Sequence, residues 1–303
     1  MKVVKPIDIY NTIEVVYNST TSSDSSLPEW DPLKADYAYE DEVKVVADKK
    51  KYKLAAQTVP AGTVPKDNPT IWVESPLVEY AMFNYKNEYA SEFNGNYVAT
   101  LPNANKIDTL YFQDIDGDSI KITLYDVNNV ELEVLEEAIY EWDITSIGSY
   151  LFPDDPVLKN KIQFDFFRID LDHIKIEILG TTTKSRYCLV GYKDDVGITL
   201  RDGIGYSQNN FYTLERDAWG NLINSGQRLI EDASLPVIDY NTEVNKNANK
   251  VSRLFGSPNL WIADDRDREN VEFDFINMFA MLISNSITPG GTVSEKILKL
   301  EGV

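Results

Sequence analysis

The sequence has few of the residues that build reactive centres. It contains one cysteine, Cys188, and one histidine, His173, in 303 residues. A single cysteine excludes an internal disulfide. One histidine and one thiol are too few ligands for a zinc site and too few groups for a Cys–His nucleophile pair. The sequence therefore predicts no metal, no cofactor and no catalytic residues, and we expect a protein that is not an enzyme.

Long apolar runs and positive charge are also scarce. No stretch of about 18 apolar residues is present to cross a bilayer. The opening segment MKVVKPIDIYNTIEVV lacks the apolar block of a signal peptide. The chain has 49 acidic against 29 basic residues, and its formal net charge of -20 repels nucleic-acid phosphates and anionic lipid headgroups. We therefore expect no nucleic-acid partner, no membrane insertion, and synthesis in a cytoplasm.

One acidic cluster invites comparison with a calcium loop. In QDIDGDS, Asp114, Asp116 and Asp118 recur at every second position. A calcium loop of the EF-hand type needs Gly at position 6 and Glu at position 12, whereas Gly117 stands at position 4 and Tyr125 at position 12. The pattern favours a hairpin turn at Asp-Gly, with a weak cation site as the alternative.

The single histidine and the single cysteine both lie in sequence contexts that favour a structural role. His173 begins the alternating segment HIKIEILG, in phase with Lys175 and Glu177, which favours a solvated strand face over a general base. Cys188 lies in the apolar context SRYCLVGY, which favours a small buried residue over a reactive thiol.

Alternation with a period of two dominates the middle of the chain. The segments 119–127, 161–169 and 173–180 each read as a strand with one apolar face. The apolar faces consist of Ile120, Ile122 and Leu124, and of Ile174, Ile176 and Ile178. Asn-Asn at 128–129 is a turn signal of the kind that ends such strands. The pattern predicts a β-sandwich.

Composition shifts divide the chain into four parts. We predict an N-terminal arm and linker at 1–29, a small all-β unit at 30–78, a jelly-roll-like β-sandwich at 79–195, and an α+β assembly domain at 196–303. The fold class is mainly β with one clear helix. That helix spans 242–255, with Asn241 or Thr242 as its cap and with Gly256 and Pro258 after it.

Two apolar segments lack an obvious partner within the chain and are predicted to form subunit interfaces. In the arm, Ile7 and Ile9 lie on an apolar face that the polar stretch NSTTSSDSS separates from the rest of the sequence. In the C-terminal domain, the run FDFINMFAMLIS carries Phe273, Phe275 and Phe279 on one face and apolar residues on the other. We expect both segments to contact another copy of the chain.

Five large aromatic residues gather in the small unit. All five lie within 43 positions of a short, polar region: Trp30, Tyr37, Tyr39, Tyr52 and Trp72. Such rings form a small core that packs against a neighbour, or they form an exposed platform for the flat face of a sugar. The sequence leaves both possibilities open.

The same aromatic residues carry a resemblance. Trp30, then Tyr-x-Tyr-x-Asp-Glu-Val at 37–43, Tyr52, and Pro69-x-x-Trp72 together resemble the small chitin-type carbohydrate-binding module. Asp41 stands where that family has a turn glycine. The resemblance implies a compact β unit with a sugar-binding ancestry.

A second resemblance covers residues 70–303. It is carried by the order of PTIWVESPLVEYAMFN, KIDTLYFQDIDGDSIKITLYD, YCLVGYKDDVGITLRDGIGYS, RDAWGNLINSGQRLIED and SPNLWIADD. This succession is similar to tail or minor structural proteins of tailed-bacteriophage virions, and its middle part is similar to galactose-binding-like jelly rolls. The resemblance implies a virion location.

From these features we expect a non-enzymatic structural component of a bacteriophage tail or neck/baseplate. It would form a homo-oligomeric ring and dock other virion tail or neck proteins. The alternative is a receptor-binding tail protein that binds a host-surface glycan. A third possibility is a glycosidase or depolymerase with its carboxylates hidden among the 49 acidic residues.

Overall fold

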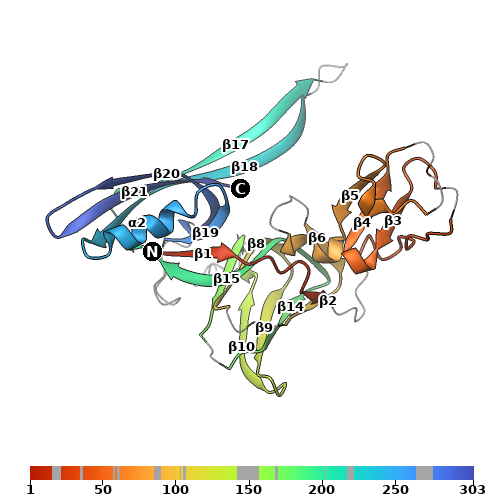
Figure 1. Cartoon of the computed structure of the whole chain (residues 1–303), viewed down its shortest axis with the longest axis horizontal. Helices are drawn as coiled ribbons and strands as arrows, with labels where there is room; N and C mark the ends of the chain where they lie inside the picture. Colours follow the sequence, from red (N-terminus) through yellow and green to blue (C-terminus); the bar gives the residue numbers. More distant parts are fainter. Residues whose placement is uncertain are drawn as a thin grey trace, which may run out of the picture. The chain divides into compact units, whose positions relative to one another are not determined.

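The computed structural model describes most of the chain, as residues 1–15, 22–34, 37–56, 59, 62–84, 90–102, 104, 107–141, 157–167, 170–200, 202–216, 222–263 and 276–303. The fold is mainly β, as predicted (Figure 1). The chain divides into two compact units: Met1–Pro6 with Gly191–Val303 forms unit 1, and Ile7–Val190 forms unit 2. None of the helices in these ranges is long and apolar enough to cross a membrane.

Unit 1 is built on one antiparallel sheet. The last residues of β15 (Thr182–Asp195) pair with β1 (Lys2–Pro6), and the sheet continues through β19, β20, β21 and β18 to β16. Strand β17 pairs with β18 outside this order. The bounds of these strands are Pro258–Ile262 for β19, Met278–Thr288 for β20, Val293–Gly302 for β21, Leu222–Tyr240 for β18, Ile198–Thr199 for β16 and Gly205–Arg216 for β17.

One face of this sheet forms the core of unit 1. Strict alternation buries Leu298 and Leu300 of β21 and Leu235 and Val237 of β18, because successive strand residues point to opposite faces. The core also includes Trp261 of β19, together with Met278, Ala280, Leu282 and, from the helix, Val251.

The helix predicted at 242–255 is confirmed as α2 (Val244–Ser252). Its predicted cap is wrong, because the N-cap residue is Glu243 and no side chain caps the helix. Asn241 instead donates its amide to the carbonyls of Gly290 and Gly291, 3.1 and 3.0 Å away. Past the helix, Gly256 adopts a left-handed φ of 79°, the conformation in which glycine is favoured after a helix.

The prediction of an N-terminal arm that pairs with another subunit is wrong. Strand β1 lies between β15 and β19 of the same chain, and Val3 and Val4 are buried there. Ile9 is buried in the core of unit 2, whereas Ile7 is 40% exposed. The alternation at 1–17 correctly indicated strand structure, but every partner strand is distant in the same chain. Residues 2–6 pair with 191–195 and 260–262, and residues 14–15 pair with 99–100.

The close approach of β1 to β15 requires glycine at position 191. A Cβ atom on Gly191 would lie 2.4 Å from Cγ1 of Val4 and 2.8 Å from the carbonyl oxygen of Lys5. We expect Gly191→Ala to destabilise unit 1 by roughly 1–3 kcal/mol, because the backbone of β1 must move. Hydrogen exchange of residues 2–6 measures this loss, and Gly205→Ala serves as the control, since its nearest neighbour atom would be 3.5 Å away. Unchanged protection of β1 in Gly191→Ala would contradict the close packing.

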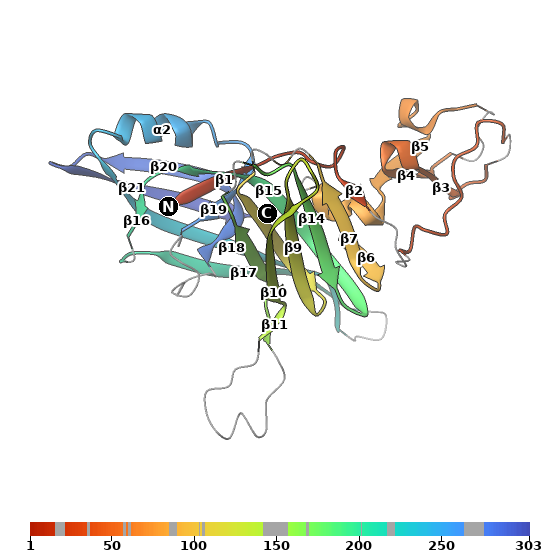
Figure 2. The same cartoon turned by 90° about the horizontal axis from the view of Figure 1, so that it is seen from below.

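Unit 2 is centred on two facing sheets. The first has the order β10-β9-β14-β7-β2, and Figure 2 shows β10, β9, β14 and β7 side by side. The second contains β13, β8 and β15, with β6 paired to β15. The bounds are Glu131–Ala138 for β10, Ser119–Tyr125 for β9, His173–Leu179 for β14, Tyr97–Leu101 for β7, Glu14–Val15 for β2, Lys161–Asp165 for β13, Thr109–Asp116 for β8 and Ser91–Asn94 for β6.

The core between these sheets confirms the predicted apolar faces. Each of the six predicted residues on β9 and β14 is at most 1% exposed. They pack with Leu110 and Phe112 of β8 and with Ile162 and Phe164 of β13. Cys188 is buried in the same core, as predicted.

Two of the predicted turns have different outcomes. Asn-Asn at 128–129 does join β9 to β10 as an antiparallel pair, with Asn129 at φ 62°. The hairpin predicted at Asp116–Gly117 is wrong, because β8 and β9 belong to different sheets. Gly117, at φ 149°, forms a corner between the sheets instead, and a Cβ there would lie 3.0 Å from the carbonyl oxygen of Leu179. Sequence signals alone do not distinguish a hairpin from a corner.

The small aromatic unit forms its own sheet within unit 2. It contains β3 (Glu42–Val45), β4 (Lys50–Leu54) and β5 (Trp72–Pro76) in the order β3-β4-β5. Short 3-10 helices lie at Val46–Asp48, Pro65–Asp67 and Val78–Phe83, and two-residue strands β11 (Tyr140–Glu141) and β12 (Val157–Leu158) pair in the sandwich region.

Candidate functional site

Most of the aromatic residues predicted to form either a small core or a sugar platform are core residues. Trp72 and Tyr52 are 1% exposed and Tyr37 is 5% exposed. The rings of Tyr37 and Trp72 meet edge to face, with their centroids 5.4 Å apart. They pack with Val43 and Leu54 in a cluster of their own. A buried ring cannot stack on a sugar, so these three residues stabilise the small sheet.

The two other aromatic residues do not complete a platform. Trp30 is half-buried and packs against the same cluster. Tyr39 is 59% exposed. A single exposed ring differs from a platform of several exposed aromatic residues, which stacking on a sugar would use.

Tyr52 offers a direct test of this core. Its hydroxyl group has no hydrogen-bond partner among the described residues. Burial, together with the carboxylates of Asp48 and Glu74, raises the pKa of Tyr52 from 10.0 to about 12. In the unfolded chain the phenol ionises near its ordinary pKa, so the folded state binds more protons between these values. Stability from Tyr52 is therefore complete below pH 10 and falls as the pH rises toward about 12.

We expect Tyr52→Phe to weaken this alkaline loss. At pH 8 the variant should be as stable as the parent or more stable by about 1 kcal/mol, because an unsatisfied buried hydroxyl is removed. Denaturant unfolding followed by tryptophan fluorescence from pH 8 to 11.5 checks both expectations. An equally steep alkaline decline in parent and variant would contradict the assignment to Tyr52.

Partly buried polar contacts join the small sheet to the rest of unit 2. The ammonium group of Lys49 donates to the carbonyls of Tyr10 and Ile13, at 3.0 and 2.6 Å, and lies 4.9 Å from the ring centre of Tyr80. Burial lowers the pKa of Lys49. Asp24, only 3% exposed, pairs with Lys51 at 2.8 Å. No sequence pattern indicates this role for Asp24, which lies in the serine-rich stretch interpreted as a linker.

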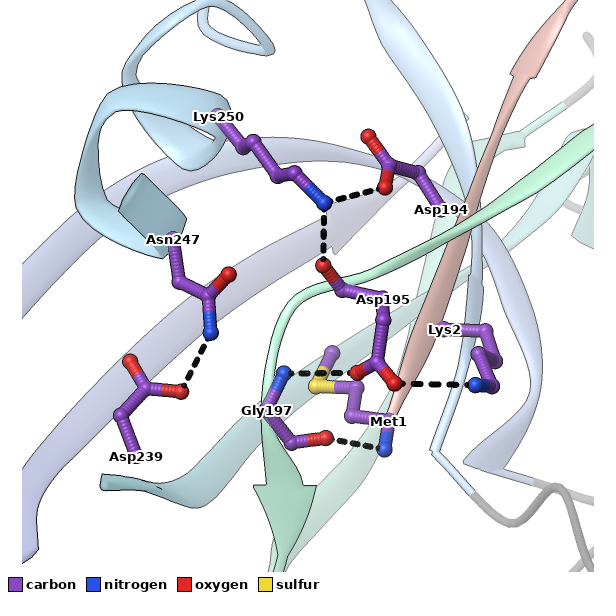
Figure 3. A network of polar contacts seen from close by, with 8 residues as sticks. All are labelled: Met1, Lys2, Asp194, Asp195, Gly197, Asp239, Asn247 and Lys250. Atoms are coloured by element: carbon purple, nitrogen blue, oxygen red, sulfur yellow. Dashed lines mark hydrogen bonds and ion pairs between the residues drawn. The ribbon is translucent and has the colours of Figure 1, made fainter. Parts of the chain in front are cut away.

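A polar network in unit 1 joins helix α2 to β1 and β15 (Figure 3). Lys250 of the helix pairs with Asp194 and donates to the carbonyl of Asp195 at 3.1 Å. The Asp195 carboxylate accepts from Lys2 at 3.0 Å and from the backbone N–H of Gly197 at 3.1 Å. Burial alone would raise the pKa of Asp195, but these two hydrogen bonds, together with the positive charges of Lys2 and the chain N-terminus, outweigh it and hold the pKa below its usual value.

The deepest part of this network is an ion pair. Asp239 of β18 and Lys296 of β21 have fully buried side chains, and their charged atoms are 2.5 Å apart. Lys296 also donates to the carbonyl of Val196 at 2.7 Å, and Asn247 of α2 donates to Asp239 at 2.9 Å. Each carboxylate of the network has a cation or an N–H group beside it. Groups that are paired within the chain in this way suit a structural role better than general acid–base catalysis, which needs a group within reach of a substrate.

The single histidine and the possible metal sites also show no arrangement for catalysis among the described residues. His173 lies on the partly exposed face of β14 with Lys175 and Glu177, as predicted, and its ring stacks on Tyr125 with ring centres 4.8 Å apart. Its Nδ1 atom lies 3.1 Å from a carboxylate oxygen of Asp172. Among the described residues, no group of three or more His, Cys, Asp and Glu is arranged to hold a metal ion.

The predicted interface residues of the C-terminal domain separate into two groups. Phe273 and Phe275 lie outside the described residues. Phe279, on β20, is 2% exposed and is therefore covered by its own chain, and Ile9 is covered in the same way at 4%. Neither Phe279 nor Ile9 is available to another subunit, so the assignment of these two residues is wrong. Ile7 is exposed, and for Ile7, Phe273 and Phe275 the interface stays a prediction.

A different element of unit 1 is exposed for contact. Strands β17 and β18 pair from Gly205 opposite Ser234 to Arg216 opposite Leu222, whereas β21 pairs with β18 only over 232–240. Residues 209–216 and 222–230 therefore form a two-stranded ribbon that runs on beyond the rest of the unit 1 sheet (Figure 1). At about 3.3 Å per residue, the ribbon is about 25 Å long. Within the described ranges, β17 pairs with no strand except β18.

An apolar patch lies on the outer face of the same sheet. Ile198 is opposite Ile238, and Pro236 is opposite Ile297. Ile198 is 51% exposed, Ile297 45%, and Tyr240, on the same face of β18, 57%. The solvated face of an antiparallel sheet is normally polar. We call these five residues the outer patch.

Comparison with protein-family models, with curated proteins and with solved structures finds no match for this chain.

Proposed function

We propose that this chain is a non-enzymatic structural component of a bacteriophage tail or neck/baseplate that assembles with copies of itself into a ring. The sequence resemblance over 70–303 supports the virion part of the proposal. The ribbon is the observation that supports assembly. An isolated two-stranded hairpin is at best marginally stable in water, so a ribbon of this length calls for a partner surface.

The distribution of polar groups also supports a structural role. The buried ion pair and the network around α2 hold unit 1 rigidly, and Lys49 and Asp24 do the same for the small sheet. The charged groups of Lys296, Asp239, Lys49 and Asp24 all bind partners within the same chain. The glycan-binding alternative has less support, because Tyr37, Tyr52 and Trp72 are buried.

Self-association of the full-length chain tests the proposal. With a formal charge of -20, identical acidic surfaces repel each other, and salt should weaken that repulsion. We expect light scattering and native mass spectrometry to show one closed oligomer whose population rises with salt, and we expect the chain in purified particles. A persistent monomer at every salt concentration, alone and with other particle proteins, together with absence from particles, would overturn the proposal.

A further inference from the structure

We propose that the ribbon of one copy docks on the outer patch of the next copy, so that the ring is held by a head-to-tail contact between two different surfaces of unit 1. This inference rests on the proposed assembly into a ring. It names the two surfaces that meet, and neither of them belongs to the segments that the sequence predicted as interfaces.

The first argument is that no described part of the same chain packs on the outer patch or pairs with the free edges of the ribbon. The exposures of Ile198, Tyr240 and Ile297 apply to the whole chain, so no described part of the same chain covers these three residues. Apolar side chains that cluster on the solvent side of a sheet mark an interaction site more often than chance exposure does. The ribbon, in turn, has two strands and no third strand beside it within the described residues.

The second argument is electrostatic. The 22 residues at 209–230 contain Glu215, Asp217, Arg216 and Arg228 as their only charged residues, so this segment has a formal charge of zero in a chain of -20. A neutral segment approaches another acidic copy without the repulsion that opposes contact between the bodies of two copies. Charge therefore favours the ribbon as the part that reaches a second copy.

The third argument concerns symmetry. The ribbon and the outer patch are different surfaces, so a contact between them is heterologous. A heterologous contact leaves one unused ribbon and one unused patch on every dimer, and it is completed only when a ring closes. By the same principle a heterologous contact builds an open filament when its rotation does not close, so the proposed ring requires a rotation that closes.

The test uses two variants of the full-length chain that each remove one surface. In the ribbon variant, residues 211–228 are replaced by Asn-Gly, which closes the hairpin at the pair Asn210–Leu229. The β18–β21 pairing begins at Asp232, so the sheet is left intact. In the patch variant, Ile198 and Ile297 are both changed to Lys. The matched control carries Val73→Lys and Val127→Lys, which are 58% and 79% exposed and lie in unit 2.

We expect each variant alone to associate about tenfold more weakly or worse, while the control assembles like the parent. An equal mixture of the two variants should form a one-to-one dimer and no ring, because the patch variant still has a ribbon and the ribbon variant still has a patch. Hydrogen exchange of β19 and β20 verifies that both variants are folded.

The outcomes separate this inference from the proposed function. If the parent forms a ring and both variants do so equally well, the ring stands and the ribbon–patch contact is wrong. If each variant is folded and monomeric but the mixture forms no dimer, the two surfaces are not partners. A photo-crosslinker at Asn209 that reacts with a different virion protein, and not with residues 236–240 of another copy, also overturns the contact. If the parent never self-associates, the proposed function fails as well.

Discussion

Trp72→Ala should unfold the small sheet while leaving unit 1 intact. The Trp72 side chain is almost completely buried between Tyr37, Val43 and Leu54. Replacing a buried Trp by Ala removes its contacts and leaves a cavity, at a cost of roughly 3–5 kcal/mol. A unit of this size has a marginal core, so this loss is comparable to its total stability. Hydrogen exchange at 42–54 and 72–76 should rise to the rate of an unfolded chain, while β20 and β21 remain protected.

Tyr39→Ala provides the matched control for this prediction. Tyr39 is 59% exposed, so the variant should change stability by about 0.5 kcal/mol or less. Binding to chitin or to a glycan array distinguishes the two roles of the aromatic residues. Loss of glycan binding in Trp72→Ala with full protection of the small sheet would show that the ring acts at the surface, in contradiction to its burial.

Lys296→Met should be the most damaging single substitution in unit 1. It leaves the Asp239 carboxylate fully buried without a counter-charge, because the Lys296 ammonium group is the partner at 2.5 Å. Breaking a buried ion pair by removing one member costs roughly 3–5 kcal/mol. We expect the loss of protection in hydrogen exchange to include β18, β21 and α2, since Asn247 joins the helix to the same carboxylate.

A second substitution should restore much of this loss. In Lys296→Met with Asp239→Asn, no net charge is buried, and the new amide oxygen can still accept from Asn247. Coupling between the two positions then appears as a strongly non-additive double-mutant cycle. Lys299→Met on the same strand is the control, because Lys299 is exposed on the opposite face. Equal effects of Lys296→Met and Lys299→Met would refute the buried pair.

The opposite outcomes for local and long-range predictions have one physical cause. Alternation in 119–127 and 173–180 correctly predicted the buried faces of β9 and β14, because period-two burial is a local property of an extended chain. The same kind of pattern at the N-terminus predicted β1 but assigned it to another subunit. Its partners, β15 and β19, are far along the chain, and a single strand pattern contains no information about which strand will pair with it.

The candidate functional residues also divide into those that local sequence predicts and those that depend on tertiary contacts. The sequence by itself determined that the protein is mainly β, acidic, and poor in groups for metal or nucleophilic chemistry, because these properties depend on composition and short-range periodicity. Only the tertiary structure decided that Trp72 is a core residue, that Asp24 and Lys296 are buried in ion pairs, and that a ribbon extends from β17 and β18. Burial and pairing depend on which distant residues fold over a given position, and tertiary contacts alone establish that.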